Sequence, residues 1–418
     1  MHIKRLFPIF LIVFTNLLGA GVVVPILPIY AEGNFGATPL QITIFVSIFY
    51  AAQSIAAPFL GRISDRVGRR PVLIVSQIGT VLSFIIFIYA APLGELVGDW
   101  ARPLGISGGL LIIYLARVLD GATGGNFIIA QAYIADTSTP ENRASSFGIL
   151  GAAFGLGFVF GPAFGGFLAP FGLTMPFIGA ALITTVSVIL TVVSLDESIP
   201  VEKRQKSKAR KAKVPISQLL NNQTIMLIAA ISFIFTLALA ILQSTIALFA
   251  DHVLFPVAAA QTVGRNVGII LAFIGIFSII IQLGLIKPLV KQFGERRVII
   301  FAGLSLIIGY LGYLYTNSAV VFVLFSAPVS IGIGVSQPTL QALITRFGTA
   351  ETQGQVLGFF QSSNNFAFII GPIGAGYLFE RYTPQAPFAV MIPFMLLAVG
   401  LSFLLLQRQN PEFIIADV

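Results

Sequence analysis

The sequence contains no cysteine and only two histidines, His2 and His252. A disulfide framework is therefore excluded, and these residue types supply no plausible set of zinc or haem ligands. We expect no cofactor and no metal site. The dipeptide Gly-Lys, which a phosphate-binding P-loop requires, occurs nowhere in the chain, and this disfavours ATP hydrolysis within it.

Charged residues are also scarce, because they make up 10% of the 418 residues while hydrophobic residues make up 56%. A soluble domain carries about 25% charged residues. The chain instead contains apolar runs long enough to cross about 30 Å of hydrocarbon, which predicts a polytopic protein of the lipid bilayer. The first run, from Leu6 to about Tyr30, is too long for the core of a signal peptide and is predicted to be the first span.

Two sets of six apolar runs predict twelve transmembrane helices. They lie near residues 7–30, 40–60, 72–91, 108–131, 145–169 and 173–194, and near 219–250, 267–286, 298–315, 319–343, 355–379 and 386–407. We predict an all-α membrane protein with two pseudo-symmetric six-helix bundles, residues 1–195 and 218–418. The linker at 196–217 contains EKRQKSKARKAK and is too polar to cross a bilayer. It is predicted to be a solvated cytoplasmic loop, with adhesion to anionic lipid headgroups as the alternative.

The net charge of +8 follows from the predicted topology. Most lysines and arginines fall at the termini and in the loops after even-numbered spans, so both termini are predicted to be cytoplasmic in a multi-pass protein of the cell membrane. A nucleic-acid partner is not expected.

The halves also repeat, since PENRASSFGILGAAFGLGFVFGPAFGGFL has a counterpart 210 residues later and DRVGRRPV has an echo, KQFGERRV, 226 residues later. Such repeats indicate a duplicated architecture.

Four motifs occur in order along the N-terminal half. The first span contains LGAGVVVPILP, the loop after the second span reads GRISDRVGRRPV, and the fourth span contains ARVLDGATGG. The fifth span carries glycines and a proline in the pattern G-x8-G-x3-G-P-x2-G-G. Together these motifs resemble the major facilitator superfamily, specifically its twelve-helix drug:proton antiporters, the group that includes tetracycline exporters. The resemblance covers the whole chain and implies a monomeric transporter with protons and a small molecule as its substrates.

Arg117 and Asp120 are the only formal charges well inside a predicted span. A charged residue at mid-membrane costs about 2.5 to 3.5 kcal/mol, so the two residues are expected to pair. Their i, i+3 spacing places them on one helix face, which Gly124 and Gln131 continue. The pair either has a purely structural role or couples proton movement to substrate transport. We favour coupling, because ionisable groups inside a membrane are functional by default.

The loop after the second span combines one carboxylate with four arginines. Either these arginines only set topology, or the loop is an ion-paired latch between helices at the cytoplasmic surface. The resemblance implies the latch, with Asp65 stabilising an outward-facing state against the other half. The gating residues are then Gly61, Asp65, Arg66, Gly68, Arg69 and Arg70.

Glycines of the fifth span lie four residues apart on one face, which permits another backbone to approach closely. This predicts either tight packing or a moving interface, and Pro162 favours a bend. The residues of this motif are Gly148, Gly157, Gly161, Pro162, Gly165 and Gly166.

Polar residues within other spans either bond helices together or line a substrate cavity. The cavity candidates are Asn16, Asn126, Gln131, Gln243, Gln337, Gln341, Gln361 and Asn365. Tetracycline-type exporters commonly carry an acid at the position of Asn16. This departure counts against a tetracycline-like substrate and leaves Asp120 as the main titratable candidate.

We therefore predict proton-coupled efflux of small amphipathic or lipophilic compounds by alternating access. A facilitator, an importer or a flippase for lipid-like molecules remains the alternative within transport. An intramembrane enzyme would need paired acids, a histidine-rich metal site or an activated nucleophile, and the predicted spans contain none of these.

Overall fold

The computed structural model describes residues 2–138, 143–198, 215–347 and 352–407. All regular secondary structure in these ranges is helical. This agrees with a chain that crosses lipid, because a helix satisfies its backbone hydrogen bonds within one segment and the hydrocarbon offers no others. The helices divide into two compact units.

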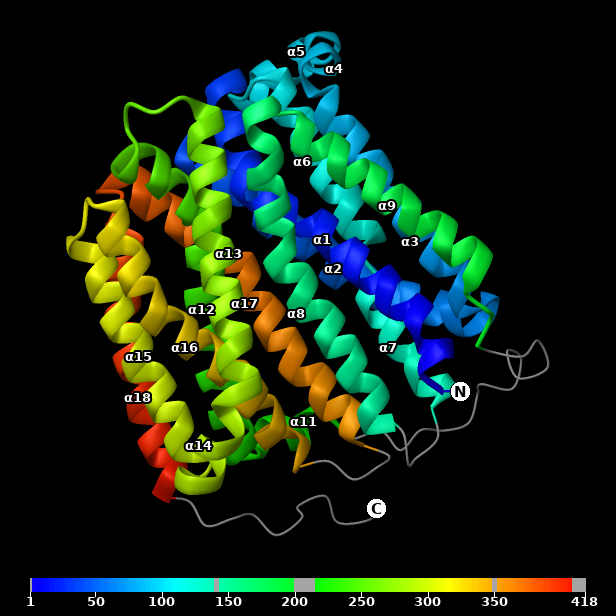
Figure 1. Ribbon diagram of the computed structural model, residues 1–418, viewed down its shortest axis with the longest axis vertical. Helices are drawn as coiled ribbons and strands as arrows, with labels where there is room; N and C mark the ends of the chain where they lie inside the picture. The colour runs from blue at the N-terminus through cyan, green and yellow to red at the C-terminus, as the bar shows by residue number, and fades with distance from the viewer. Residues whose placement is uncertain (1, 139–142, 199–214, 348–351, 408–418) are drawn as a thin grey trace. The chain divides into compact units, whose positions relative to one another are not determined.

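The first unit comprises Met1–Lys208 and Ile246–Ala272. In it, α1 lies between α8 and α9, while α3 packs against α9 and α6, and α2 packs against α6 (Figure 1). A buried apolar cluster that includes Ile9, Leu73 and Ile134 joins α1, α3, α7 and α8. The elements are α1 (His2–Phe35), α2 (Pro39–Val67), α3 (Arg69–Ile88), α4 (Ala90–Leu96), α5 (Gly98–Ala101), η1 (Arg102–Leu104), α6 (Gly108–Thr123), α7 (Asn126–Thr137), α8 (Arg143–Leu168), η2 (Ala169–Phe171), α9 (Met175–Ser194) and the π-turn η3 (Ala250–Leu254).

The second unit comprises Ala209–Thr245 and Phe273–Val418. Here α15 packs against both α16 and α18. Its elements are α11 (Ile216–Asn221), α14 (Ile286–Phe293), α15 (Glu295–Tyr315), α16 (Ala319–Thr345), α17 (Gln353–Arg381) and α18 (Ala386–Gln407), together with most of α12 (Gln223–Phe249) and the second half of α13 (Ala260–Gly284). The predicted domain division at 196–217 falls largely outside the described residues and stays a prediction.

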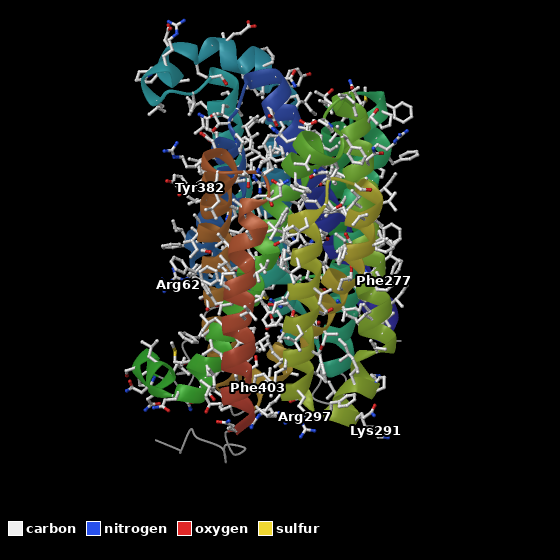
Figure 2. All side chains as sticks on the ribbon, turned by 90° about the vertical axis from the view of Figure 1, so that its left-hand side faces the viewer. Arg62, Phe277, Lys291, Arg297, Tyr382 and Phe403 are labelled. Atoms are coloured by element: carbon white, nitrogen blue, oxygen red, sulfur yellow. The ribbon has the colours of Figure 1, made fainter. Side chains whose placement is uncertain are left out.

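Many large apolar side chains face outward from both units. Ile55 on α2 is 69% exposed. Phe403 on α18, which Figure 2 labels, is 51% exposed. Lys291 and Arg297 lie at one end of the second unit (Figure 2). Apolar exposure on this scale would cause aggregation in water, and it is what a lipid-facing surface requires.

Ten described helices are long and apolar enough to cross a membrane. The number rises to 11 if Gly98–Leu104 and Gly108–Thr137, which meet at an 87° bend, form one span. The helix α17 is 29 residues long but is not among the apolar candidates, and it carries Gln361, Asn364 and Asn365. A multi-pass membrane fold is thus established, and the count of twelve stays a prediction.

The fourth predicted span, 108–131, is not one continuous helix. It breaks at Gly124 and Gly125, where α6 ends and α7 begins. Two consecutive glycines weaken helix propagation, and the side-chain amide of Gln53 donates to the Gly124 carbonyl at 2.8 Å, which satisfies an acceptor that the break releases. The expected stripe from Asp120 to Gln131 is therefore interrupted, because Gln131 lies on α7.

The internal repeat reappears in backbone geometry. Gly68 joins α2 to α3 with φ 118° and ψ 157°, and Gly294, 226 residues later, joins α14 to α15 with φ 77° and ψ 154°. Only glycine adopts such angles without strain. The repeated glycine is therefore required by the same sharp turn between two helices in each unit.

We predict that Gly68→Ala destabilises the α2–α3 turn by about 1 to 3 kcal/mol, the cost of a side chain at such backbone angles. Hydrogen exchange of the purified protein should show faster exchange in the first turn of α3. Gly61→Ala is the matched control, because Gly61 lies in α2 with no atom within 4 Å of an added Cβ. Equal protection of the first turn of α3 in both variants would contradict the conclusion that this turn requires glycine at position 68.

Candidate functional site

Arg117 and Asp120 form a buried ion pair on α6, as their spacing predicted. The Nη1 atom of Arg117 lies 2.9 Å from Oδ2 of Asp120, and the two side chains are 9% and 7% exposed. Arg117 also donates through Nε to the Phe45 carbonyl and stacks over the Phe49 ring at 4.3 Å from its centroid. The helix α2 thus holds the guanidinium in place through a carbonyl and an aromatic face.

Close contacts of small residues surround this pair. A Cβ on Gly121 would lie 2.4 Å from the Phe49 carbonyl oxygen, and one on Gly79 of α3 would lie 2.3 Å from the Thr123 hydroxyl. The glycines therefore allow α2, α3 and α6 to pack closely around the ion pair of Arg117 and Asp120, which is buried. The pair lies one turn before the break at Gly124.

Asn126 begins α7 directly after that break. It is 3% exposed, and both atoms of its side-chain amide are buried without a hydrogen-bond partner among the described residues. An unpaired buried amide carries a cost of about 1 to 3 kcal/mol. This unpaired amide directly after the helix break supports its place among the cavity candidates.

The loop between α2 and α3 is organised around Arg69, which is 8% exposed. Its Nη2 lies 2.7 Å from Oδ1 of Asp65, its Nε lies 3.0 Å from Oδ2 of Asp136 on α7, and its Nη1 donates to the Ser64 hydroxyl at 2.6 Å. Each of the three guanidinium nitrogens of Arg69 therefore has a partner, so this arginine does more than set topology.

Arg70 and Glu197 form hydrogen bonds with backbone groups at the ends of helices next to Arg69. The Glu197 carboxylate accepts from the backbone N–H groups of Arg69 at 2.8 Å and Arg70 at 3.2 Å, which begin α3. Arg70 donates to the carbonyls of Thr191 and Val192, near the end of α9. An acid at a helix start and a base at a helix end both complement the helix dipole. The loop thus ties together the ends of α2, α3, α7 and α9.

Sequence reasoning missed Asp136 and Glu197. Both follow long apolar runs and resemble ordinary boundary charges, and Glu197 falls within the predicted linker. Only the folded chain brings them to Arg69. By contrast, Arg62 and Arg66 are exposed, and the described residues show no ion pair to either. The latch against the other half of the chain stays a prediction, since the described partner of Asp65 is Arg69.

The fifth-span motif, on α8, forms a close crossing with α1. A Cβ on Gly157 would lie 2.6 Å from the Leu17 Cβ, and a Cβ on Gly161 would lie 2.7 Å from the Cα of Gly21. A Cβ added at Gly165 would likewise lie 3.1 Å from the Val22 carbonyl oxygen. These glycines make backbone-to-backbone contact possible along one face, as their spacing predicted.

Other residues of this motif behave differently. Gly166 approaches α13, where an added Cβ would lie 2.8 Å from the Cα of Gly268. Pro162 is buried inside the helix. Gly148 has no atom within 4 Å of an added Cβ, so packing does not explain its place in the motif.

The remaining cavity candidates are dispersed. Gln337 donates to the Thr236 hydroxyl at 2.8 Å. Gln361 donates to Asn365 at 3.1 Å, so these two residues share a face of α17. Gln341 is exposed, and the side chains of intermediate exposure are those of Asn16, Gln131 and Gln243. Their role as a substrate cavity stays a prediction.

Comparisons with known proteins agree with the motifs. A family model described as Major Facilitator Superfamily matches residues 9–347 and 253–414. The chain is 30% identical to tetracycline resistance protein, class C, of Escherichia coli, over 85% of this chain and 84% of that protein. It is 28% identical to multidrug resistance protein 2 of Bacillus subtilis (strain 168), over 96% of both. Its identity to the quinolone resistance protein NorA of Staphylococcus aureus (strain MSSA476) is 24%, over 97% of both.

Solved structures agree on the fold. A mutant form of the nucleoside transporter NupG matches with a TM-score of 0.77 at 14% identity, covering 96% of this chain and 100% of that one. The human organic anion transporter MFSD10 matches with a TM-score of 0.67 at 22% identity, covering 96% and 99%. At these identities the likeness concerns the fold alone.

We predict that Gly161→Leu separates α1 from α8 and destabilises the protein by about 1 to 3 kcal/mol, the usual cost of overpacking. The span stays apolar, so membrane insertion should persist. The measurement is the thermal unfolding midpoint in detergent. Gly148→Leu is the control, because Gly148 faces open space. Similar midpoints for both variants would show that the crossing tolerates bulk.

We predict that Arg69→Lys weakens the loop cluster by about 1.5 to 3 kcal/mol for each charged hydrogen bond lost, because one ammonium cannot reach Asp65, Asp136 and Ser64 together. Spin labels on introduced cysteine pairs at the ends of α2 and α7 should report a broader distance distribution. Arg66→Lys is the control, since Arg66 is exposed. An unchanged distribution in the Arg69 variant would leave the cluster without a structural role.

Proposed function

The chain belongs to the major facilitator superfamily of membrane transporters, and we propose that it exports small amphipathic or lipophilic compounds in exchange for protons. The observation that carries this proposal is the buried pair of Arg117 and Asp120. A structural pair could be replaced by apolar residues at no loss of stability. A titratable carboxylate buried beside a helix break instead suits a group that gains and loses a proton.

Protonation of Asp120 removes the partner of Arg117 and changes the charge of the site from zero to +1. The guanidinium then loses its charged partner, while its contacts with the Phe45 carbonyl and the Phe49 ring do not depend on that proton. A charge that moves across the membrane potential changes in free energy by about 2.3 kcal/mol per 100 mV. Proton binding can thereby bias the two access states, provided that each state exposes Asp120 to a different side.

The names of the relatives support a drug-like substrate. They refer to tetracycline, to quinolones and to several drugs. These compounds share aromatic or amphipathic character, and this chain contains 38 phenylalanines that suit such surfaces. Asn16 replaces the acid expected of a tetracycline exporter, so we propose a lipophilic substrate other than tetracycline.

The loop cluster supports the proposed topology. Arg69 bonds to Asp136, which follows the fourth span, and to Glu197, which follows the sixth, so the loops after even-numbered spans meet on one side. The basic residues of these loops support the proposal that this side faces the cytoplasm, with both termini there. We propose a monomer in the cell membrane, with no nucleic-acid partner.

Asp120→Asn should keep substrate binding within a small factor and abolish uphill export, because it keeps the shape of the side chain and loses its proton. Proteoliposomes with an imposed pH gradient and a panel of lipophilic cations and neutral drugs would measure accumulation. Only downhill exchange should remain in the variant.

The control is Asp99→Asn, which changes the same group in an exposed ion pair with Arg102. It should export like the unchanged protein. If the Asp120 variant accumulates substrate equally well, Asp120 is only a structural partner of Arg117. If the unchanged protein moves substrate with no dependence on the gradient, the chain is a facilitator.

A further inference from the structure

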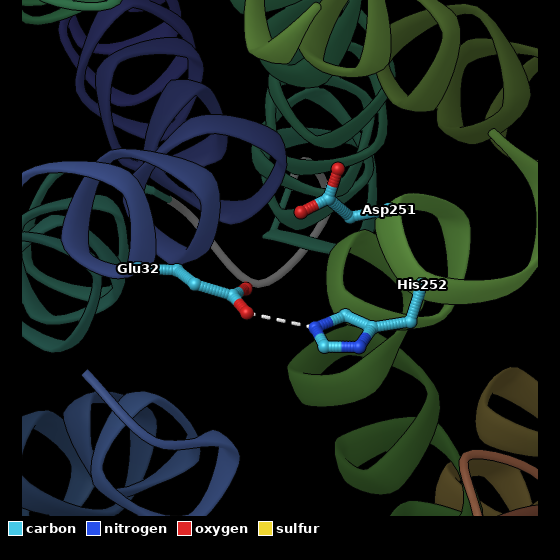
Figure 3. A group of neighbouring side chains, drawn as sticks. All are labelled: Glu32, Asp251 and His252. Atoms are coloured by element: carbon cyan, nitrogen blue, oxygen red, sulfur yellow. Dashed lines mark hydrogen bonds and ion pairs between the residues drawn. The ribbon is translucent and has the colours of Figure 1, made fainter. Parts of the chain in front are cut away.

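Three side chains that could each offer a metal-ligand atom meet at the end of α1 that lies far from the N-terminus. Glu32 projects from α1, while Asp251 and His252 project from the π-turn η3 at the end of α12 (Figure 3). One ligand atom from each residue lies within 4.8 Å of the other two. All three residues belong to the first compact unit, and none belongs to the ion pair or the loop cluster described above.

We propose that Glu32, Asp251 and His252 bind a divalent transition-metal ion, for which Zn²⁺ is the probe. An imidazole nitrogen with two carboxylate oxygens is a common ligand set for such ions, and a zinc site of this kind leaves its fourth position to water. Mg²⁺ and Ca²⁺ prefer sites built from oxygen alone. The two carboxylates supply the negative charge that a divalent cation needs.

The geometry is close to what an ion requires. Nε2 of His252 lies 2.8 Å from Oε1 of Glu32, a hydrogen-bond distance that a metal would replace. Ligand atoms that share one ion at about 2.0 to 2.2 Å lie at most about 4.4 Å apart. The three atoms therefore need only small side-chain rotations to surround an ion.

Glu32 provides a second and independent indication. Its other carboxylate oxygen, Oε2, is buried and has no hydrogen-bond partner among the described residues. A buried charged oxygen without a partner is costly. A bound cation would satisfy it, whereas the hydrogen bond to His252 uses only the first oxygen.

The π-turn explains why both ligands of η3 reach the same site. Such turns widen the helix by one residue and are frequent at functional sites. Here the turn presents two consecutive residues, Asp251 and His252, toward α1. An ion bound there would join α1 to η3, two segments more than 200 residues apart in the sequence.

This proposal revises the expectation of no metal site. That expectation rested on the lack of cysteine and on only two histidines. One histidine is sufficient when tertiary structure brings two carboxylates to it. The proposed site uses His252 alone of the two.

Equilibrium dialysis of the purified full-length protein against Zn²⁺, after removal of any affinity tag, tests the proposal. We expect about one Zn²⁺ per chain and a raised thermal unfolding midpoint, with no change in Mg²⁺ at the same concentration. His252→Asn should lower the affinity at least tenfold, and Glu32→Gln and Asp251→Asn should also weaken it. His2→Asn is the matched control and should bind like the unchanged protein.

The proposal fails if the unchanged protein binds no Zn²⁺ or if His252→Asn binds as tightly. It also fails if only the His2 variant loses binding. Folding of each variant is checked by its elution as a single species in detergent. Binding is measured without transport, so the outcome does not depend on the proposed export.

Discussion

Lipid offers no hydrogen bonds, and every departure from a continuous helix in this protein has to be compensated by the protein itself. At the break in the fourth span, the Gln53 side-chain amide donates a hydrogen bond to the Gly124 carbonyl that the helix leaves without a partner. At the start of α3 the open N–H groups bond to Glu197, and near the end of α9 the carbonyls bond to Arg70. The side chains of Gln53, Glu197 and Arg70 therefore bond backbone groups where a helix breaks, begins or ends.

Burying charge obeys the same constraint. Arg117 and Asp120 share one helix turn, and Arg117 in addition contacts a carbonyl and an aromatic ring of α2. Arg69 distributes its donors over Asp65, Asp136 and Ser64. Both arginines use the fan-shaped arrangement of guanidinium donors, which a lysine lacks. Each centre joins helices of the first unit.

Glycine provides the complementary property, because it lets backbones touch where side chains would keep helices apart. Gly161 on α8 meets Gly21 on α1, and in the second unit Gly371 on α17 meets Leu237 on α12. These positions are the two copies of one repeated motif. The glycine is therefore repeated in both units, but close backbone contact occurs at Gly161, whereas Gly371 lies against the Leu237 side chain.

The sequence alone determined the membrane class, the helical fold, the family, the Arg117–Asp120 pair and the glycine face, because each depends on hydropathy or on spacing within one helix. The glycines at 124 and 125 weaken the helix, but the sequence could not reveal that it breaks there, since the amide that bonds the released carbonyl comes from Gln53 on another helix. Nor could it join Asp136 and Glu197 to Arg69, or Glu32 to His252. Those residues are far apart in the chain, and their charges resemble ordinary boundary residues. Only tertiary packing decides which of them meet, because it sets the distances over which charges and hydrogen bonds act.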